Sequence, residues 1–160
     1  MRVEHIQPFV SAAAYVLKHE LNADVERGEL SVAETDYTTK EITVLIGITG
    51  DLEGTVLFGT NEEMAMNIVY ELTGERKVFY DDTSESAIAE LGNVISGRAT
   101  VLFEQQGIMC NISPPTVITG RGTIISSVNM KRLIVPLRTP LGDMDIAISL
   151  RERKESPAGE

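Results

Sequence analysis

A strictly alternating apolar segment that leads into a tight turn constrains the fold of this chain more than any other feature. Every second residue from 42 to 48 is isoleucine or valine, which is the period of two that a β-strand shows. Gly50-Asp51 then forms a turn, and residues 52–58 return as the partner strand of a hairpin. Residues such as Leu45 between the alternating positions are also apolar. The pattern therefore predicts an antiparallel pair of strands that is covered on both faces along part of its length.

A helix is expected ahead of the hairpin, over residues 6–21. Apolar residues recur there at helical spacing, Pro8 suits a first turn, and Asn22 can close the C-terminal end. Between this helix and the hairpin, residues 25–32 form a weaker strand candidate, because Gly28 lowers the strand propensity of this segment.

A second helix follows the hairpin. Thr60 and Glu63 form a capping-box pattern, in which two side chains three residues apart satisfy backbone N–H groups at the helix start. Gly74 is typical of a residue that ends a helix. The stripe that this helix is expected to bury consists of Met64, Ile68 and Leu72.

The longest helix comes next. Asp82 and Glu85 resemble a second capping box, and the helix is expected to run to about Gln106, with Gly107 as its stop. Its core-facing stripe is Ile88, Leu91, Ile95, Ala99 and Leu102, at about 100° of rotation per residue.

The remainder of the chain has the composition of short strands. The candidate segments are 116–119, 123–128, 133–137 and 144–150, with a turn at 140–143. Pro136 indicates an edge strand or a bulge. This order of elements predicts an α+β fold, in which two long helices and a shorter one pack on a largely antiparallel sheet. Residues 1–150 are expected to form a single domain, and residues 151–160 a charged tail that is disordered.

Composition limits the classes of function. A chain of 160 residues with 42% hydrophobic content suits one ordinary core. The 24 acidic and 14 basic residues give a net charge of −10, which argues against binding to nucleic acid or to anionic lipid. The single cysteine, Cys110, is expected to be a buried apolar residue in a protein of the reducing cytoplasm. No segment is long and apolar enough to suggest a signal peptide or a membrane span.

The long helix carries a polar pair on the side away from its core stripe. Glu90 and Asn93 lie three residues apart, so their side chains are neighbours on one face. Small residues surround them where long charged side chains would be usual. We expect four of these residues to face a binding partner, namely Ser86, Ala89, Ser96 and Gly97. Gly92 and Gly97 each cost about 1 kcal/mol of helix propensity relative to alanine, which suggests close approach of another backbone. That backbone belongs either to the same fold or to a partner.

Other residues carry less chemistry. His5 and His19 are far from any cysteine pair, so no metal site is expected. Residues 120–122 contain two glycines without a longer phosphate-binding pattern and predict a turn. Asp143 and Asp145 alternate outward on the last strand and are expected to be solvated. By itself Glu-x-x-Asn is a weak pattern, and an ordinary solvated helix face is the alternative to a functional site.

Three segments together resemble a known family. Residues 90–97, Glu-Leu-Gly-Asn-Val-Ile-Ser-Gly, are similar to the helix signature of the CheC/CheX/FliY phosphatases of bacterial and archaeal chemotaxis. Residues 54–58 and 112–120 also resemble that family, and the similarity extends over most of the chain. CheC-type members carry two Glu-x-x-Asn motifs in two pseudo-symmetric halves, whereas in this chain Met66 stands three residues after Glu63. A single motif resembles the CheX branch, whose members work as homodimers.

The resemblance implies a function and residue roles. It implies hydrolysis of the aspartyl phosphate on a CheY-type response regulator, a reaction that depends mostly on positioning and electrostatics. Asn93 would orient the attacking water, and Glu90 would dock on the regulator's active-site lysine. Mg²⁺ would be supplied by the regulator, and this chain would bind no cofactor of its own. The alternative is a non-catalytic adaptor or flagellar-switch module that uses the same helix face.

Overall fold

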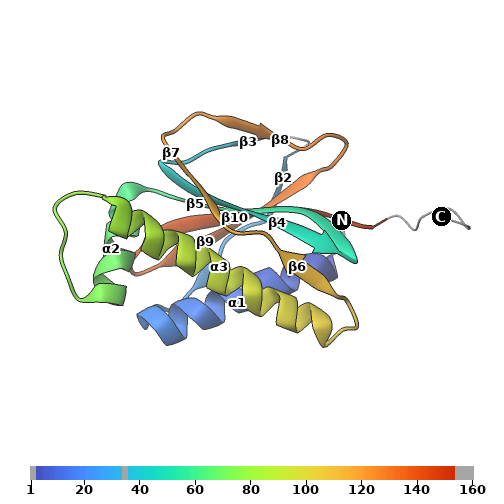
Figure 1. Ribbon diagram of the computed structural model, residues 1–160, viewed down its shortest axis with the longest axis horizontal. Helices are drawn as coiled ribbons and strands as arrows, with labels where there is room; N and C mark the ends of the chain where they lie inside the picture. Colours follow the sequence, from blue (N-terminus) through green and yellow to red (C-terminus); the bar gives the residue numbers. More distant parts are fainter. Residues whose placement is uncertain (1–2, 34–35, 154–160) are drawn as a thin grey trace, which may run out of the picture.

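Helices cover one face of an antiparallel sheet in the computed structural model, which describes residues 3–33 and 36–153 (Figure 1). The helices of this part of the chain are α1 (Val3–Leu21), α2 (Glu62–Thr73) and α3 (Asp82–Glu104). The strands are β1 (Glu26–Arg27), β2 (Ser31–Ala33), β3 (Asp36–Thr38), β4 (Ile42–Gly50), β5 (Leu52–Thr60), β6 (Cys110–Ile112), β7 (Thr116–Thr119), β8 (Ile124–Ser126), β9 (Arg132–Thr139) and β10 (Gly142–Glu152). The α+β class, with two long helices and a shorter one, is confirmed.

The main sheet is ordered β1-β9-β10-β5-β4-β6, with β2 beside β1 on β9 and β7 beside β6 on β4. Every pairing in it is antiparallel, and the predicted hairpin of β4 and β5 lies near its centre. Strands β3 and β8 form a separate two-stranded unit, here called the β3–β8 ribbon. In Figure 1 this ribbon lies on the side of the main sheet opposite to α1 and α3.

The alternation in β4 sets the position of the core. Its isoleucine and valine side chains are all at most 3% exposed and belong to the large cluster between sheet and helices. On the opposite face, Leu57 of β5 and Ala147 of β10 pack with Tyr37 of the ribbon in a smaller cluster. The expectation that the hairpin is covered on both faces is therefore confirmed.

The starts of α1 and α2 differ from the predictions. Helix α1 begins at Val3, so Pro8 lies inside it; Ile6, ahead of the proline, belongs to the buried face and holds the first turn against the core. Helix α2 is capped by Asn61, whose Oδ1 accepts a hydrogen bond of 2.8 Å from the Met64 N–H. Thr60 is instead the last residue of β5, and its hydroxyl donates to the carbonyl of Asp143.

The buried stripe of α2 is also different from the one predicted. It consists of Met64, Ala65, Ile68 and Val69. Leu72 is 39% exposed, because the last turn of α2 extends past the edge of the core. The predicted end of the helix is confirmed, since Gly74 adopts a left-handed conformation with φ of 75° and donates its N–H to Tyr70.

Pro136 is not at an edge of the sheet. Strand β9 pairs with β10 on one side and with β1 and β2 on the other, and Pro136 faces the gap between β1 and β2. There the N–H of Gly28 donates to the Pro136 carbonyl at 2.8 Å. A side chain on Gly28 would contact the proline ring, so the glycine that weakens this segment also allows it to pass the ring.

Asp145 is not solvated as predicted. Its side chain is only 15% exposed, beneath the β3–β8 ribbon, where the Tyr37 hydroxyl donates a hydrogen bond of 2.7 Å to it. Lys40 Nζ lies 3.7 Å from the other carboxylate oxygen. Burial raises the pKa of Asp145 above its usual range, while the Tyr37 and Lys40 contacts oppose that shift. Asp143, two residues earlier, is exposed as expected.

The domain extends further towards the C-terminus than predicted. Strand β10 continues to Glu152, Arg151 forms an ion pair of 2.8 Å with Glu53, and the Arg153 N–H donates to the Asp51 carbonyl. Residues 151 and 152 thus belong to the sheet, Arg153 is hydrogen-bonded to the turn before β5, and the rest of the expected tail lies outside the described residues. Cys110 is only half-buried, and burial raises the pKa of its thiol.

Candidate functional site

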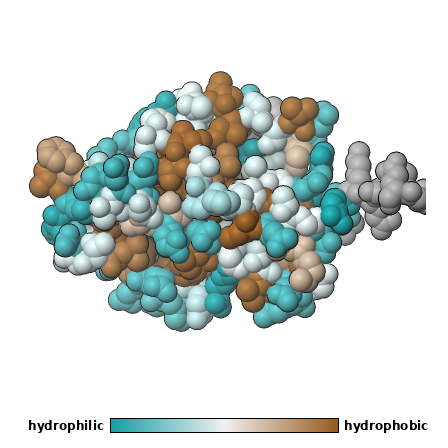
Figure 2. All heavy atoms as spheres, viewed as in Figure 1, coloured by the Kyte–Doolittle hydropathy of each residue, from teal (hydrophilic) through white to brown (hydrophobic). Residues whose placement is uncertain are grey.

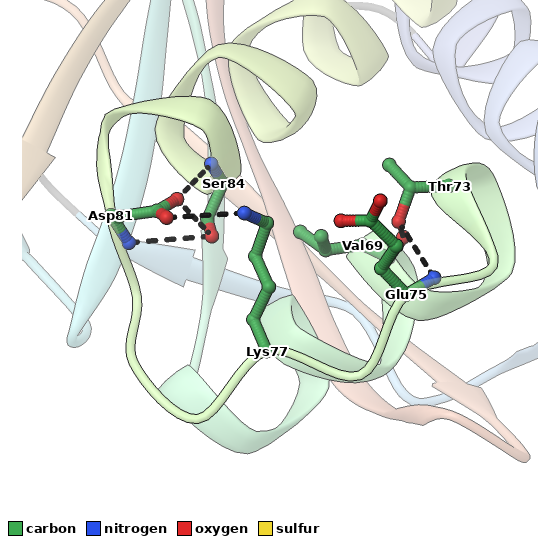
Figure 3. Close-up of polar contacts among 6 residues, drawn as sticks. All are labelled: Val69, Thr73, Glu75, Lys77, Asp81 and Ser84. Carbon is green, nitrogen blue, oxygen red and sulfur yellow. Dashed lines mark hydrogen bonds and ion pairs between the residues drawn. The ribbon is translucent and has the colours of Figure 1, made fainter.

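The candidate site lies on α3, and the start of this helix is fixed by a capping box one residue earlier than predicted. Asp81 is the cap: its Oδ1 accepts hydrogen bonds of 2.9 Å from both the N–H and the hydroxyl of Ser84 (Figure 3). In return, the Asp81 N–H donates to the Ser84 hydroxyl. Asp82 and Glu85 instead lie in the first turn, where their negative charges interact favourably with the positive end of the helix dipole.

The loop between α2 and α3 is held by contacts at both of its ends. Lys77 Nζ lies 3.1 Å from the Asp81 carboxylate, and the Thr73 hydroxyl donates to Val69 and accepts from the Glu75 N–H (Figure 3). The Thr73 contacts are local to the end of α2, and the Lys77 contact is local to the cap of α3.

The buried face of α3 is wider than the predicted stripe. Its buried residues beyond the first turn are Ile88, Leu91, Gly92, Ile95, Ser96, Ala99 and Phe103. A Cβ on Gly92 would lie 3.0 Å from Val44 of β4, so the first of the two glycines allows close packing within the same fold.

Ser96 does not belong to the partner-facing surface, and that prediction is wrong. Its side chain is fully buried, because α3 packs against both the sheet and α1, and contact with two elements covers more of its circumference than a single stripe. The hydroxyl of Ser96 has no hydrogen-bond partner among the described residues.

The structure leaves Glu90 accessible and Asn93 half-buried on the outer face of α3. Neither side chain forms a hydrogen bond or ion pair with the described part of the chain. Ser86 is exposed one turn before Glu90, and Ala89 is partly exposed beside it. A carboxylate and a carboxamide are thus both free to contact another molecule.

Gly97 gives this face an open position. A Cβ placed on it would meet no atom within 4 Å, in contrast to Gly92. Its carbonyl accepts a hydrogen bond of 2.6 Å from the Thr100 hydroxyl. No packing within the described chain requires glycine here, and the small residue leaves room for a partner to approach the helix.

The structure adds a groove that the sequence did not indicate. It has a volume of about 210 Å³, lies beside Glu90 and is bordered by residues of α1 and α2 as well as α3. The sequence pattern assigned Leu72 to the buried stripe of α2, whereas in the structure this side chain is 39% exposed and lines the groove. A larger hollow of about 470 Å³ lies elsewhere, lined by residues that include Lys40, Arg121 and Asp145.

Metal-ligand clusters and membrane-spanning helices are both absent from the described residues. No group of three or more histidine, cysteine, aspartate or glutamate side chains in residues 3–33 and 36–153 is placed to hold a metal ion. Within the same residues, no helix combines the length and the hydropathy that crossing a membrane requires.

We expect the cap of α3 to contribute to stability in a pH-dependent manner. Replacing Asp81 by alanine should lower Tm by about 2–4 °C at pH 7, because two N-terminal donors lose their acceptor. The hydrogen bond from the Ser84 backbone, with Lys77, lowers the pKa of Asp81 to about 2. A lowered pKa in the folded state means that the ionised cap stabilises the protein above about pH 4 and loses this effect as the pH falls towards 2.

Thermal unfolding at pH 7 and pH 2.5 tests this expectation, with Asp82→Ala as the matched control in the next position. The difference in Tm between the unaltered protein and Asp81→Ala should shrink at the lower pH. An equal loss from Asp82→Ala at pH 7 would contradict the assignment of Asp81 as the cap.

Comparison with known proteins identifies the family. Residues 42–138 match the model of the chemotaxis phosphatase CheX family. The CheY-P phosphatase CheX of Thermotoga maritima is 26% identical over 152 residues, which cover 91% of this chain and 95% of that protein.

Solved structures share the fold. CheX in the CheX–CheY–BeF₃–Mg²⁺ complex from Borrelia burgdorferi has a TM-score of 0.78 and 28% identity, and the match covers 94% of this chain and 100% of that one. A CheC-like superfamily protein from Shewanella sp. PV-4 has a TM-score of 0.86 at 24% identity, covering 94% and 99% of the two chains. With a family match that spans most of the sheet and all of α2 and α3, this chain belongs to the chemotaxis phosphatase CheX family.

Proposed function

We propose that this protein hydrolyses the aspartyl phosphate of a CheY-type response regulator. The observation that carries the proposal is the Glu90–Asn93 pair, which a capped helix presents without partners in the described part of the chain. Membership of the CheX family supports it, as does the relative from Thermotoga maritima, which is a CheY-P phosphatase. The complex from Borrelia burgdorferi, in which CheX is bound to CheY, supports a regulator as partner.

Asn93 is the catalytic residue in this proposal. Its carboxamide oxygen accepts a hydrogen bond from a water molecule and holds that water in line with the phosphorus and the leaving carboxylate oxygen. Attack forms a new P–O bond as the bond to the regulator's aspartate breaks, which yields inorganic phosphate and a free carboxylate. A carboxamide suits this task because it orients the water and needs no change in protonation at neutral pH.

Glu90 is the docking residue. Its carboxylate would pair with the lysine in the regulator's active site, where a charge-assisted hydrogen bond also fixes the orientation of α3. Ser86, Ala89 and Gly97 form the surrounding surface, because their short side chains allow the helix to enter a shallow active site.

Mg²⁺ in this proposal is bound by the regulator, where it neutralises charge on the phosphoryl group; Mg²⁺ is also present in the CheX–CheY complex from Borrelia burgdorferi. A cytoplasmic location follows from such a partner.

We further propose a homodimer. An interface remote from α3 is supported by exposed apolar side chains near the β3–β8 ribbon. These side chains are Val32, Ile124 and Val128, which are 59%, 63% and 80% exposed.

Replacing Asn93 by alanine should remove phosphatase activity and preserve binding. We expect kcat for phosphate release from a phosphorylated CheY-type regulator of the same organism to fall at least 100-fold, on the order of a lost positioning group. The dissociation constant for the regulator activated by BeF₃⁻ and Mg²⁺ should stay within about threefold. A variant that retains the unaltered rate would contradict the assignment, and binding without any acceleration by the unaltered protein would favour the adaptor function.

Replacing Glu90 by glutamine should affect binding and rate together. The variant keeps the size of the side chain and removes the charge, so loss of the charge-assisted pair should weaken binding of the activated regulator by about tenfold or more. Fluorescence titration measures this, with Glu104→Gln near the other end of α3 as the control. Equal affinity of Glu90→Gln and the unaltered protein would exclude Glu90 as a docking residue.

Replacing Gly97 by leucine should weaken docking without damage to the fold. Its Cβ position is open within this chain, and leucine has a higher helix propensity than glycine, so Tm should stay equal or rise. The larger side chain should collide with the regulator and raise KM about tenfold or more. Gly97→Ala should show a smaller effect in the same assay, and an unchanged KM for the leucine variant would remove Gly97 from the interface.

A further inference from the structure

The groove beside Glu90 is an apolar surface that no element of the described chain covers. Its lining residues are Val16 and Glu20 from α1, Leu72 from α2, and Ala87, Glu90, Leu91 and Val94 from α3. Its volume of about 210 Å³ is the size of one long side chain. In the space-filling view, apolar surface is visible between α3 and α1 at the end of the molecule near α2 (Figure 2).

Two of the lining residues are apolar side chains that are exposed. Leu72 and Val94 are each 39% exposed, although leucine and valine on amphipathic helices usually face the core. They come from different helices, α2 and α3, and both line the groove. Exposed apolar side chains that gather in one hollow are typical of a surface that a partner covers.

The charges of the groove are all of one sign. Glu20 and Glu90 are both exposed carboxylates that line it, and none of its lining residues is basic. A side chain that suits an apolar groove with two carboxylates has an aliphatic stem and a cationic end, as lysine and arginine have.

The groove and Asn93 lie on opposite sides of Glu90. At about 100° per residue, Asn93 is rotated about 60° to one side of Glu90 on α3, and Val94 about 40° to the other. Because Glu90 itself lines the groove, a partner that docks on Glu90 reaches the edge of the groove as well. Continuity with the docking residue makes the regulator the occupant, in preference to an unrelated protein.

We propose that this groove binds a lysine or arginine side chain on the surface of the response regulator, next to its phosphorylation site. The aliphatic stem lies along Leu72 and Val94, and the cation pairs with Glu20, which leaves Glu90 for the lysine within the active site. This inference rests on the proposed function. It makes Glu20 and Leu72 determinants of which regulator is bound, with no part in the hydrolysis itself.

Steady-state phosphate release and titration with the BeF₃⁻–Mg²⁺-activated regulator test the proposal with two matched pairs of variants. Glu20→Gln is compared with Glu104→Gln, an exposed carboxylate near the far end of α3. Leu72→Asn is compared with Met109→Asn, whose native side chain is 57% exposed just beyond α3. We expect both groove variants to raise KM and Kd by about threefold or more, with kcat within about twofold, and both controls to match the unaltered protein.

The result for Glu20→Gln should also depend on salt. The unaltered protein should lose affinity as NaCl is raised from 50 to 300 mM, and Glu20→Gln should lose less, because one charge pair is already absent. Leu72→Asn should keep the full salt dependence. This difference separates the cationic end of the bound side chain from its aliphatic stem.

The same experiments distinguish failure of the groove proposal from failure of the proposed phosphatase function. If the unaltered protein accelerates phosphate release and Asn93→Ala does not, while both groove variants keep the unaltered KM and Kd, the groove proposal is wrong and the phosphatase stands. If Leu72→Asn binds more weakly but Glu20→Gln does not, even at 50 mM NaCl, the occupant is an uncharged apolar side chain and the proposal is overturned. If the unaltered protein neither binds the activated regulator nor accelerates release, both proposals fall.

Discussion

The close packing of α3 against β4 determines where the candidate site lies. Gly92 brings the helix backbone to within contact of Val44, and the apolar residues of α3 on either side of that contact are buried between the sheet and α1. Glu90 lies two residues before Gly92 and Asn93 one residue after it, so the same contact that buries one face of the helix turns these two side chains outward. A larger residue at position 92 would move the helix, and the site with it, relative to the sheet.

In the proposed function the rigidity of α3 matters, because its polar groups act there on a second molecule. A site on a capped helix keeps its geometry better than one on a loop, and the energy of binding is then not spent on ordering the helix. Asp81 and Ser84 fix the start of α3, and Lys77 joins that cap to the loop from α2. Val78 and Phe79 in this loop are 86% and 78% exposed, and apolar side chains project at this end of the molecule (Figure 2).

Periodicity in the sequence predicted the elements and the main faces, because one buried side is what a strand or helix pattern reports. Residues 42–58 gave the hairpin that lies near the centre of the sheet, and the pattern of α3 placed Glu90 and Asn93 on the outer face. Periodicity does not report the burial that results when a helix or strand packs against a second element. Ser96 is buried because α3 has two packing partners, and Asp145 is buried because the β3–β8 ribbon, built from two strands of three residues, covers the outer face of β10. Ribbon strands this short are below the length at which alternation is recognisable.

The groove escaped prediction for a related reason. Its walls come from three helices that are far apart in the sequence, so no local pattern joins Glu20, Leu72 and Val94. In the proposed mechanism two tasks are separated around Glu90: Asn93 on one side acts on the attacking water, whereas the groove on the other side contributes only to binding. A residue that contacts the regulator equally before and during hydrolysis changes KM and leaves kcat unaltered. On this proposal, substitutions at Glu20 and Leu72 change which regulator is bound and leave the chemistry proposed for Asn93 unaltered.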